Sequence, residues 1–315
     1  MMRNKIVLLI LCFSLVFPLF SACANPSEDD GRVRVIATNF AMYDFARAVC
    51  GDDADVTMLL TPGSESHDFE ATLEDVAKIA EADVFVYVGG ESDAWVDGVF
   101  ESIGSASDSI VKICAMDVVD ACTVDHDHAV TDDHDHDHGH ETDEHVWTSI
   151  PNAISIIEAI ADAVAELLPE SASEIEERCS TYVDELLEID REMMELVESA
   201  ERRTIVVADR FPFVHMAEHL GVDYVAAFDG CTSDTEPSLS VINTLVREVR
   251  ENGIDTVFVI EFSDRKTAGA IADETGAEIL ELSSAHNVTK AEFESGITYA
   301  DIMRKNMAAL ESALD

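Results

Sequence analysis

Basic residues are scarce in this chain of 315 residues. Lys and Arg total 19 against 65 Asp and Glu, which gives a formal net charge of −46 at pH 7. Binding to nucleic acid depends on cationic side chains that neutralise phosphates, so we expect no nucleic-acid partner. A surface this acidic stays solvated and attracts cations. The composition therefore favours functions in which the ligand is a cation.

Cysteine is too scattered to build a disulfide framework or a zinc knuckle. Apart from Cys12 and Cys23 near the N-terminus, five cysteines remain, and none of them forms a C-x-x-C pair. One or two disulfides stay open as an alternative, because pairing cannot be deduced from the sequence. We expect these five to act as small buried apolar residues. They are Cys50, Cys114, Cys122, Cys179 and Cys231.

The chain also lacks an apolar run long enough for a comfortable membrane span. The N-terminal run IVLLILCFSLVFPLF has 15 residues, between a basic MMRNK and the small residues SA, whereas a span needs roughly 20. This three-part pattern predicts a signal peptide over residues 1–22. Because SAC resembles a lipobox, we expect lipidation of Cys23, a lipid-anchored tether over 23–32 and a location outside the cytoplasmic membrane. A plain cleaved signal or an uncleaved anchor is the alternative.

Short Val/Ile-rich runs alternate with helical patterns in both halves of the chain. Helices are expected from near Met42, Leu73 and Trp95, and then over 213–220, 239–252 and 267–275. Continuous apolar strands separated by helices indicate parallel sheets that are buried on both faces. The expected strands lie at 33–39, 55–60, 84–89, 110–114, 204–209, 222–228, 256–262 and 278–282.

A long helical region separates the two sets of strands. A helix is expected from Pro151 to Pro169, and residues 170–202 then run for about 30 residues without Gly or Pro, with apolar residues at a helical period. Such a helix is about 45 Å long and stiff. We therefore predict an N-terminal α/β domain over 33–169, a linking helix over 170–202 and a C-terminal α/β domain over 203–315.

Four stretches place His or carboxylate groups shortly after a strand or before a helix. His67 lies in LLTPGSESHDFEAT, His145 in DEHVWTSIPNA, and Glu281 and His286 in EILELSSAHNVTK; the remaining stretch is VVADRFPF. In open parallel sheets, ligands bind outside the carboxyl ends of the strands. We therefore expect these residues to form a binding site.

The motifs PGSESHDFEAT, DEHVW and VFVIEF, with the acidic His-rich segment and the long central helix, resemble the metal-binding lipoproteins of zinc and manganese ABC importers. The resemblance covers essentially the whole mature chain. The subset with DRFPF and a HNV…TY ending is the most similar, and it is a zinc-binding subset. The resemblance implies two (β/α) domains with a metal held in the cleft between them.

The resemblance also implies a set of ligands. His67 and His145 match the two ligands of the N-terminal domain, and His286 matches the acidic ligand that follows the last strand. At the third ligand position this chain has Arg210, which cannot bind a cation. Asp209 is the nearest donor, and Glu281 is an alternative to His286 if the register differs. Three imidazoles and at most one carboxylate favour Zn²⁺, whereas more carboxylates would favour Mn²⁺.

The stretch from Asp125 to Trp147 contains seven of the eleven histidines and nine carboxylates. Alternating Asp and His offer overlapping weak sites without fixed geometry, and the composition cannot build a core. We interpret 125–141 as an antenna that concentrates cations, and His145, followed by Val and Trp, as the one fixed ligand. A merely solubilising acidic loop is the alternative.

One motif points to an enzyme instead. His215, Glu218 and His219 match H-x-x-E-H, the inverted zinc-peptidase signature. The expected helix is short, and the family has a packed aromatic residue where this chain has His215. The chain has no G-x-S-x-G motif and no phosphate-binding loop. We therefore expect a protein that is not an enzyme.

The function predicted from these observations is capture of Zn²⁺ outside the cytoplasmic membrane and its delivery to the permease of an ABC importer. We expect a monomer held at the membrane surface by its lipid. A manganese or iron(II) carrier of the same fold is the first alternative, and the peptidase is the second. Adhesion to host surfaces, a role sometimes assigned to similar lipoproteins, is not tested by anything in the sequence.

Overall fold

The computed structural model describes residues 31–65, 69–119, 142–228 and 236–314. The predicted signal peptide, Cys23, His67 and the His-rich segment 125–141 lie outside these residues. Residues from Arg32 onward form one compact unit. Within the described part of the chain, no helix has both the length and the apolar character needed to cross a membrane.

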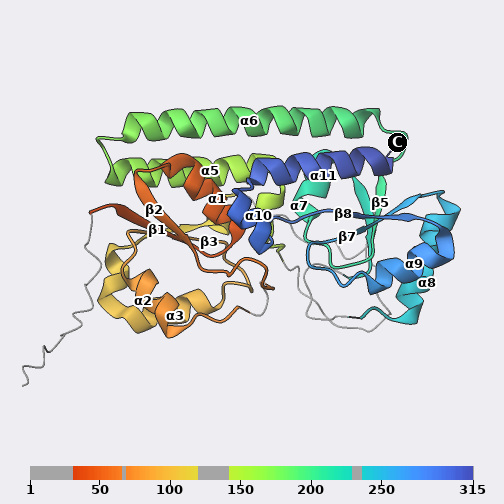
Figure 1. Ribbon diagram of the computed structural model, residues 1–315, viewed down its shortest axis with the longest axis horizontal. Coiled ribbons are helices and arrows are strands. Elements are labelled where there is room, and N and C mark those ends of the chain that lie inside the picture. Colours follow the sequence, from red (N-terminus) through yellow and green to blue (C-terminus); the bar gives the residue numbers. More distant parts are fainter. Residues whose placement is uncertain (1–30, 66–68, 120–141, 229–235, 315) are drawn as a thin grey trace, which may run out of the picture. The chain divides into compact units, whose positions relative to one another are not determined.

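The first sheet confirms the four strands expected in the first half of the chain (Figure 1). All neighbouring strands are parallel, in the spatial order β2-β1-β3-β4. The strand order therefore reverses between β1 and β3, which is where open α/β sheets bind ligands. The strands are β1 (Val33–Ala37), β2 (Ala54–Met58), β3 (Val84–Tyr87) and β4 (Val111–Cys114).

The second sheet repeats this arrangement. Its strands are parallel in the order β6-β5-β7-β8, so its reversal lies between β5 and β7. The fold is therefore two α/β domains, each built on a parallel sheet, as predicted. The strands are β5 (Thr204–Val207), β6 (Asp223–Ala226), β7 (Thr256–Val259) and β8 (Glu278–Glu281).

Helices connect successive strands in both sheets. The crossovers in the first domain are α1 (Phe40–Cys50), α2 (Leu73–Ala80), α3 (Trp95–Ile103) and the 3-10 helix η1 (Gly104–Ser109), and those in the second domain are α7 (Val214–Leu220), α8 (Leu239–Glu251) and α9 (Lys266–Thr275). The other helices are α4 (Ala115–Val118), the 3-10 helix η3 (Val146–Thr148), α5 (Ile150–Leu167), α6 (Ala172–Ser199), α10 (Lys290–Ser295) and α11 (Tyr299–Leu314).

One hydrophobic core is shared by both domains. It contains side chains from α1, α5, α6, the loop after β5 and α11, among them Phe40, Ile157, Leu186, Phe211 and Tyr299. Each sheet has one smaller hydrophobic cluster on its other side. This cluster lies beneath α2 and α3 in the first domain and beneath α8 and α9 in the second. The continuous core explains why residues from Arg32 onward form a single compact unit; the predicted domain limits at residues 169 and 203 stay predictions.

Helix α6 runs along both domains (Figure 1). It contacts α1 and α5 on the first side and α7 and α11 on the second. Its 28 residues correspond to about 42 Å. Its buried residues recur every three or four positions, which places them on one face: Ile175, Cys179, Tyr182, Leu186, Ile189, Met193 and Val197.

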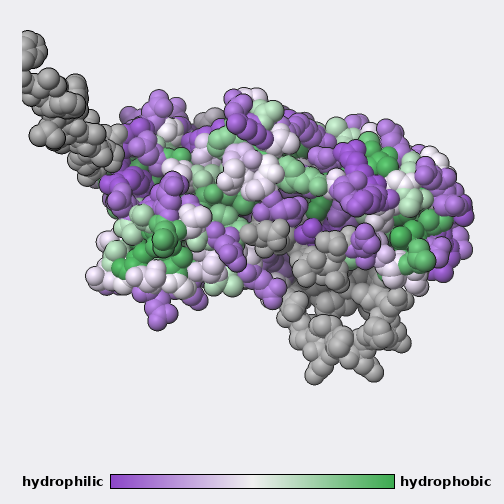
Figure 2. All heavy atoms as spheres, turned by 60° about the horizontal axis from the view of Figure 1, so that its bottom comes forward, coloured by the Kyte–Doolittle hydropathy of each residue, from purple (hydrophilic) through white to green (hydrophobic). Residues whose placement is uncertain are grey.

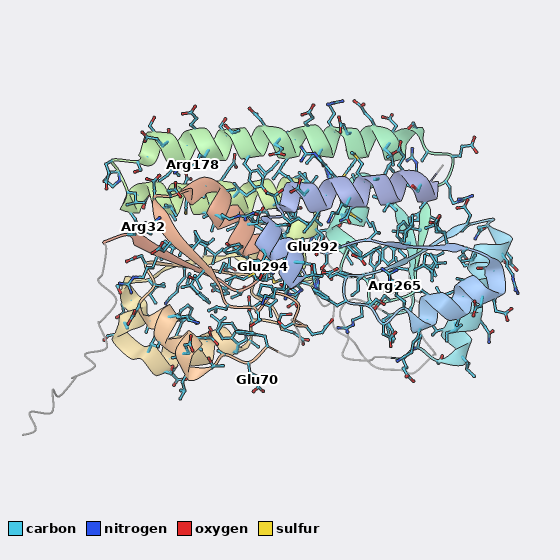
Figure 3. The ribbon with its side chains drawn as sticks, viewed as in Figure 1. Arg32, Glu70, Arg178, Arg265, Glu292 and Glu294 are labelled. Carbon is cyan, nitrogen blue, oxygen red and sulfur yellow. The ribbon has the colours of Figure 1, made fainter. Side chains whose placement is uncertain are left out.

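Polar contacts fix α6 against its neighbours. Arg178, labelled in Figure 3, donates to the main-chain oxygens of Val49 and Cys50 at the end of α1, at 2.8 and 2.9 Å. Tyr182 donates to Oδ2 of Asp44 at 2.6 Å, and the same oxygen accepts the N–H of Tyr299 at 2.8 Å. Asp44 is 1% exposed, and it therefore joins α1, α6 and α11 inside the shared core.

Two of the three cysteines that the structure describes are buried as expected, and Cys114 is only partly buried. Cys50, Cys114 and Cys179 are free thiols, and Cys50 and Cys179 are buried. Burial raises the pKa of Cys50 to about 12, which keeps its thiol protonated. Cys122 and Cys231 lie outside the described residues.

One face of the molecule is predominantly hydrophilic, with smaller hydrophobic areas between (Figure 2).

Candidate metal centre

Two of the predicted ligands meet in the structure. His145 precedes η3 and His286 follows β8, yet the centroids of their rings are 5.7 Å apart and the rings are inclined at 75°. His145 is 1% exposed and His286 is 8% exposed. Two nearly buried imidazoles from distant parts of the chain therefore line the same cavity.

Asp143 holds His145. Its Oδ1 accepts the main-chain N–H of His145 at 2.9 Å and lies 3.2 Å from Nδ1 of the same ring. A ring that gives its Nδ1 proton to a carboxylate carries its lone pair on Nε2, the usual arrangement for a histidine that binds a metal. Burial favours a raised pKa for Asp143, but the charge and hydrogen bonds of His145 and the charge of His215 hold it below its ordinary value.

Trp147 connects the two histidines. Its ring lies 5.2 Å from the ring of His145 and 5.1 Å from that of His286, measured between centroids. Its Nε1 donates to the main-chain oxygen of Ser284 at 2.7 Å, and its own main-chain oxygen accepts the hydroxyl of Tyr299 at 2.6 Å. Trp147 is fully buried. The segment that carries His145 is therefore tied to the loop that carries His286.

The cavity beside the histidines also contains charged groups. Glu261 and Arg210 are both among its lining residues. They follow β7 and β5, so they stand at the reversal of strand order in the second sheet. Arg210 pairs with Glu65 at 3.8 Å. Arg210 lies at the third position of the predicted ligand set, and its guanidinium contributes positive charge there instead of a ligand.

Glu261 was not among the predicted site residues. Its Oε2 accepts the main-chain N–H of Ser284 at 2.8 Å, and its Oε1 accepts the Ser284 hydroxyl. Desolvation by burial raises its pKa. The sequence signal was the acid in VFVIEF, which directly follows a buried strand, but a single glutamate at a strand end is too common to be selected without its neighbours.

The other predicted donors have different surroundings. Asp209 is partly buried and its Oδ1 accepts the N–H of Arg210 at 3.0 Å; it is not among the residues that line the histidine cavity. Glu281 pairs at 3.0 Å with Arg265, which is labelled in Figure 3, and lines a neighbouring cavity. Within the described ranges no cluster of three or more His, Cys, Asp and Glu side chains could hold a metal. His67 lies outside those ranges, so the full ligand set stays a prediction.

Backbone strain occurs on both sides of this cavity. Ala285, directly before His286, has φ 57°, and Phe262, directly after Glu261, has φ 60°. Residues other than glycine adopt such angles rarely, and they persist where the surrounding structure imposes them, often at binding sites. At Ala285 the two flanking residues are bonded to each other, because the N–H of His286 donates to Oγ of Ser284 at 3.2 Å. This bond holds the backbone of Ala285 in its conformation.

The residues of the peptidase-like motif do not converge. His215 is buried, and its Nε2 donates to the main-chain oxygen of Asp143 at 3.0 Å. His219 lies against α6, where its Nε2 is 2.7 Å from Oδ1 of Asp190. Glu218 is exposed. The two imidazoles therefore serve different partners, and His215 supports the segment that carries His145.

Comparison with known proteins decides the family. Residues 35–313 match the family described as zinc-uptake complex component A, periplasmic (ZnuA). The chain belongs to this family. The resemblance to metal-binding lipoproteins of ABC importers is thereby confirmed, as is the expectation that the protein is not an enzyme, since members of the family are solute-binding proteins. The word periplasmic agrees with the predicted location outside the cytoplasmic membrane.

Individual relatives carry zinc in their names. The zinc-binding protein AdcA of Streptococcus pyogenes serotype M18 is 33% identical over 322 residues, which are 100% of this chain and 62% of AdcA. The high-affinity zinc uptake system protein ZnuA of Bacillus subtilis is 29% identical over 310 residues, 96% of this chain and 95% of that protein. The Zn(II)-bound ZnuA-like domain of Streptococcus pneumoniae AdcA has a TM-score of 0.75 and 26% identity, and the match covers 90% of this chain and 100% of that domain.

Proposed function

We propose that the protein captures Zn²⁺ outside the cytoplasmic membrane and delivers it to the permease of an ABC importer, anchored at the membrane by lipidated Cys23. The observation that carries this proposal is the meeting of His145 and His286 at 5.7 Å between ring centroids. Two nearly buried imidazoles at one cavity, in a chain of the zinc-uptake family, are suited to hold a cation between the two domains.

The choice of zinc rests on the chemistry of the ligands. His67, His145 and His286 would provide three neutral nitrogen donors, and Asp209 ranks below them because its carboxylate bonds the N–H of Arg210. Zn²⁺ is commonly held by nitrogen and sulfur ligands in tetrahedral sites, whereas Mn²⁺ prefers oxygen-rich sites. With three nitrogen donors and at most one carboxylate in the proposed set, zinc is favoured over manganese and iron(II). The relatives compared above are named for zinc.

The His-rich segment 125–141 would act as an antenna. It ends just before Asp143 and His145 in the chain, so a cation that it attracts is delivered close to the fixed site. A loop that only solubilises needs carboxylates but not six histidines.

A competitive chelator titration tests both proposals. The chain from Ala24 onward is compared with the same chain lacking 125–141, with Zn²⁺ and Mn²⁺ in separate titrations. We expect one tight zinc site in both proteins and weak manganese binding. Loss of the tight site on deletion would mean that the His-rich segment itself is the site.

Single substitutions locate the fixed site. His145→Ala and His286→Ala should each weaken zinc binding at least a hundredfold, because each removes one of few ligands. His219→Ala is the matched control, since this imidazole pairs with Asp190 on α6 and does not line the cavity. Equal zinc affinity in all three variants would place the metal elsewhere.

A further inference from the structure

Glu261 lies in the wall between two cavities. One of them also contains His145 and His286, and the other extends over Glu281 and Glu292 towards α11. The side chain of Glu261 is partly buried, and desolvation raises its pKa, so the local structure disfavours the ionised carboxylate. A carboxylate placed at such a cost has a role beyond filling space.

Both side-chain oxygens of Glu261 are bonded to the same neighbouring residue. Its two oxygens accept the N–H and the hydroxyl of Ser284, which is itself 3% exposed. Oγ of Ser284 in turn accepts the N–H of His286 at 3.2 Å, and its main-chain oxygen accepts Nε1 of Trp147 at 2.7 Å. Ser284 therefore links Glu261 to the His286 loop and to the segment that carries His145.

This linkage holds a strained loop in place. Between Ser284 and His286 stands Ala285, with φ 57°. Without the carboxylate, the hydroxyl and N–H of Ser284 lose their acceptors, and the loop can relax to an ordinary backbone conformation that moves the His286 ring. The linkage thus fixes the position of one candidate ligand relative to Trp147 and His145.

The charge of Glu261 has a second consequence. The proposed ligands are neutral imidazoles, so a bound divalent cation would keep its full charge beside the guanidinium of Arg210, which lines the same cavity. Glu261 lines it too and supplies a compensating negative charge in a partly desolvated place, where electrostatic interactions are stronger than in water.

We propose that Glu261 is a positioning residue of the metal site, which fixes His286 through Ser284 and compensates the charge of the bound cation. This inference rests on the proposed function, because it requires His286 to be a ligand. Outer residues that orient ligands typically change metal affinity ten- to a hundredfold when they are replaced.

The test compares two glutamates of the second domain. Glu261→Gln keeps the size of the side chain and removes its charge. Glu278→Gln is the control, because Glu278 is an exposed residue at the start of strand β8 and lines neither cavity. We expect the first substitution in the full chain to weaken zinc binding about ten- to a hundredfold by chelator competition, and the second to leave it unchanged.

Two further measurements separate positioning from mere folding. The visible absorption spectrum of the Co²⁺-loaded protein reports ligand geometry, and we expect it to change in Glu261→Gln and in Ser284→Ala but not in Glu278→Gln. Denaturation of the metal-free proteins reports folding separately: Glu261→Gln should keep a cooperative transition and lose at most about 1–3 kcal/mol, because Gln retains only one of the two oxygens that accept from Ser284.

The outcomes are distinct. Unchanged zinc affinity and Co²⁺ spectrum in Glu261→Gln, with a strong loss in His286→Ala, would overturn this inference and leave the proposed function intact. Unchanged affinity in His286→Ala would overturn both. If Glu261→Gln does not fold, Ser284→Ala decides, since it cuts the same linkage and retains the carboxylate.

Discussion

Replacement of Asp143 by Asn probes how strongly the orientation of His145 contributes to metal binding. Asp143 is 5% exposed and accepts both the main-chain N–H of His145, at 2.9 Å, and its ring Nδ1–H, at 3.2 Å. Asn retains an oxygen that can accept from the main chain. The substitution therefore removes the charge while the segment keeps its local geometry.

The expected loss follows from the strength of these bonds. A hydrogen bond to a charged group contributes about 1.5–3 kcal/mol, roughly twice a neutral one, so the change costs about 1–1.5 kcal/mol at the ring. That is about five- to tenfold in affinity. The ring also becomes a weaker base towards the cation, which extends the expected range to about a hundredfold. Asp143→Ala should in addition destabilise the fold by about 1–3 kcal/mol, because it leaves a buried N–H unpaired.

Chelator competition with Zn²⁺ measures the affinity, and denaturant unfolding of the metal-free protein measures the stability. Asp190→Asn is the matched control: this aspartate also contacts a histidine, His219, at 2.7 Å, but on α6 and away from the cavity. We expect the control to bind zinc as the wild type does. If Asp143→Asn binds zinc within twofold of wild type while His145→Ala does not bind it, the carboxylate has no part in orienting the ligand.

Three further outcomes are expected. Burial raises the pKa of Asp93 from 3.8 to about 6, so the folded state binds this proton more tightly than the unfolded state, and the wild type loses stability as the pH rises from about 4 to 6. The free energy of unfolding of Asp93→Asn relative to wild type should therefore increase by up to about 3 kcal/mol between pH 4 and pH 8. Denaturant unfolding measures this difference, and a difference that does not vary with pH would contradict the prediction. Tyr182→Phe removes the hydrogen bond to Asp44 and should lower the free energy of unfolding by about 2 kcal/mol, with a change below 0.5 kcal/mol as the contrary result. Zinc affinity should fall below about pH 6 as the imidazoles protonate. Titrations at pH 5 and pH 7 measure this, and equal affinities would exclude histidine ligands.

Much of the fold could be predicted because its strands are short and apolar. The runs around Val35 and Val257 are buried on both faces, so they contain almost no polar residues. Most of the helices that connect the strands end at a glycine, as α1, α3, α7 and α9 do. The last helix, Tyr299–Leu314, was not among the predicted elements. It packs against α6 and carries Tyr299, whose bonds to Asp44 and Trp147 depend on residues far away in the sequence.

The candidate site was only partly predictable. His145 and His286 could be selected from motifs, and the structure brings them together. Asp143, Glu261 and the bond from Trp147 to Ser284 were not selected, because an acid or a tryptophan acquires a role of this kind only from its neighbours in space. Asp209, which could be selected, follows β5 but does not line the histidine cavity, and its role as a ligand stays a prediction.

The sequence by itself determined the class of fold and the residue types available to bind a cation, since hydrophobic periodicity and local motifs are properties of neighbouring positions. Only the tertiary structure decided that the loop carrying His286 meets the segment carrying His145. Glu261 and Ser284 are 23 residues apart, and Trp147 and Ser284 are 137 apart. The packing of two sheets and one long helix around a common core creates these contacts, and no pattern along the chain encodes them directly.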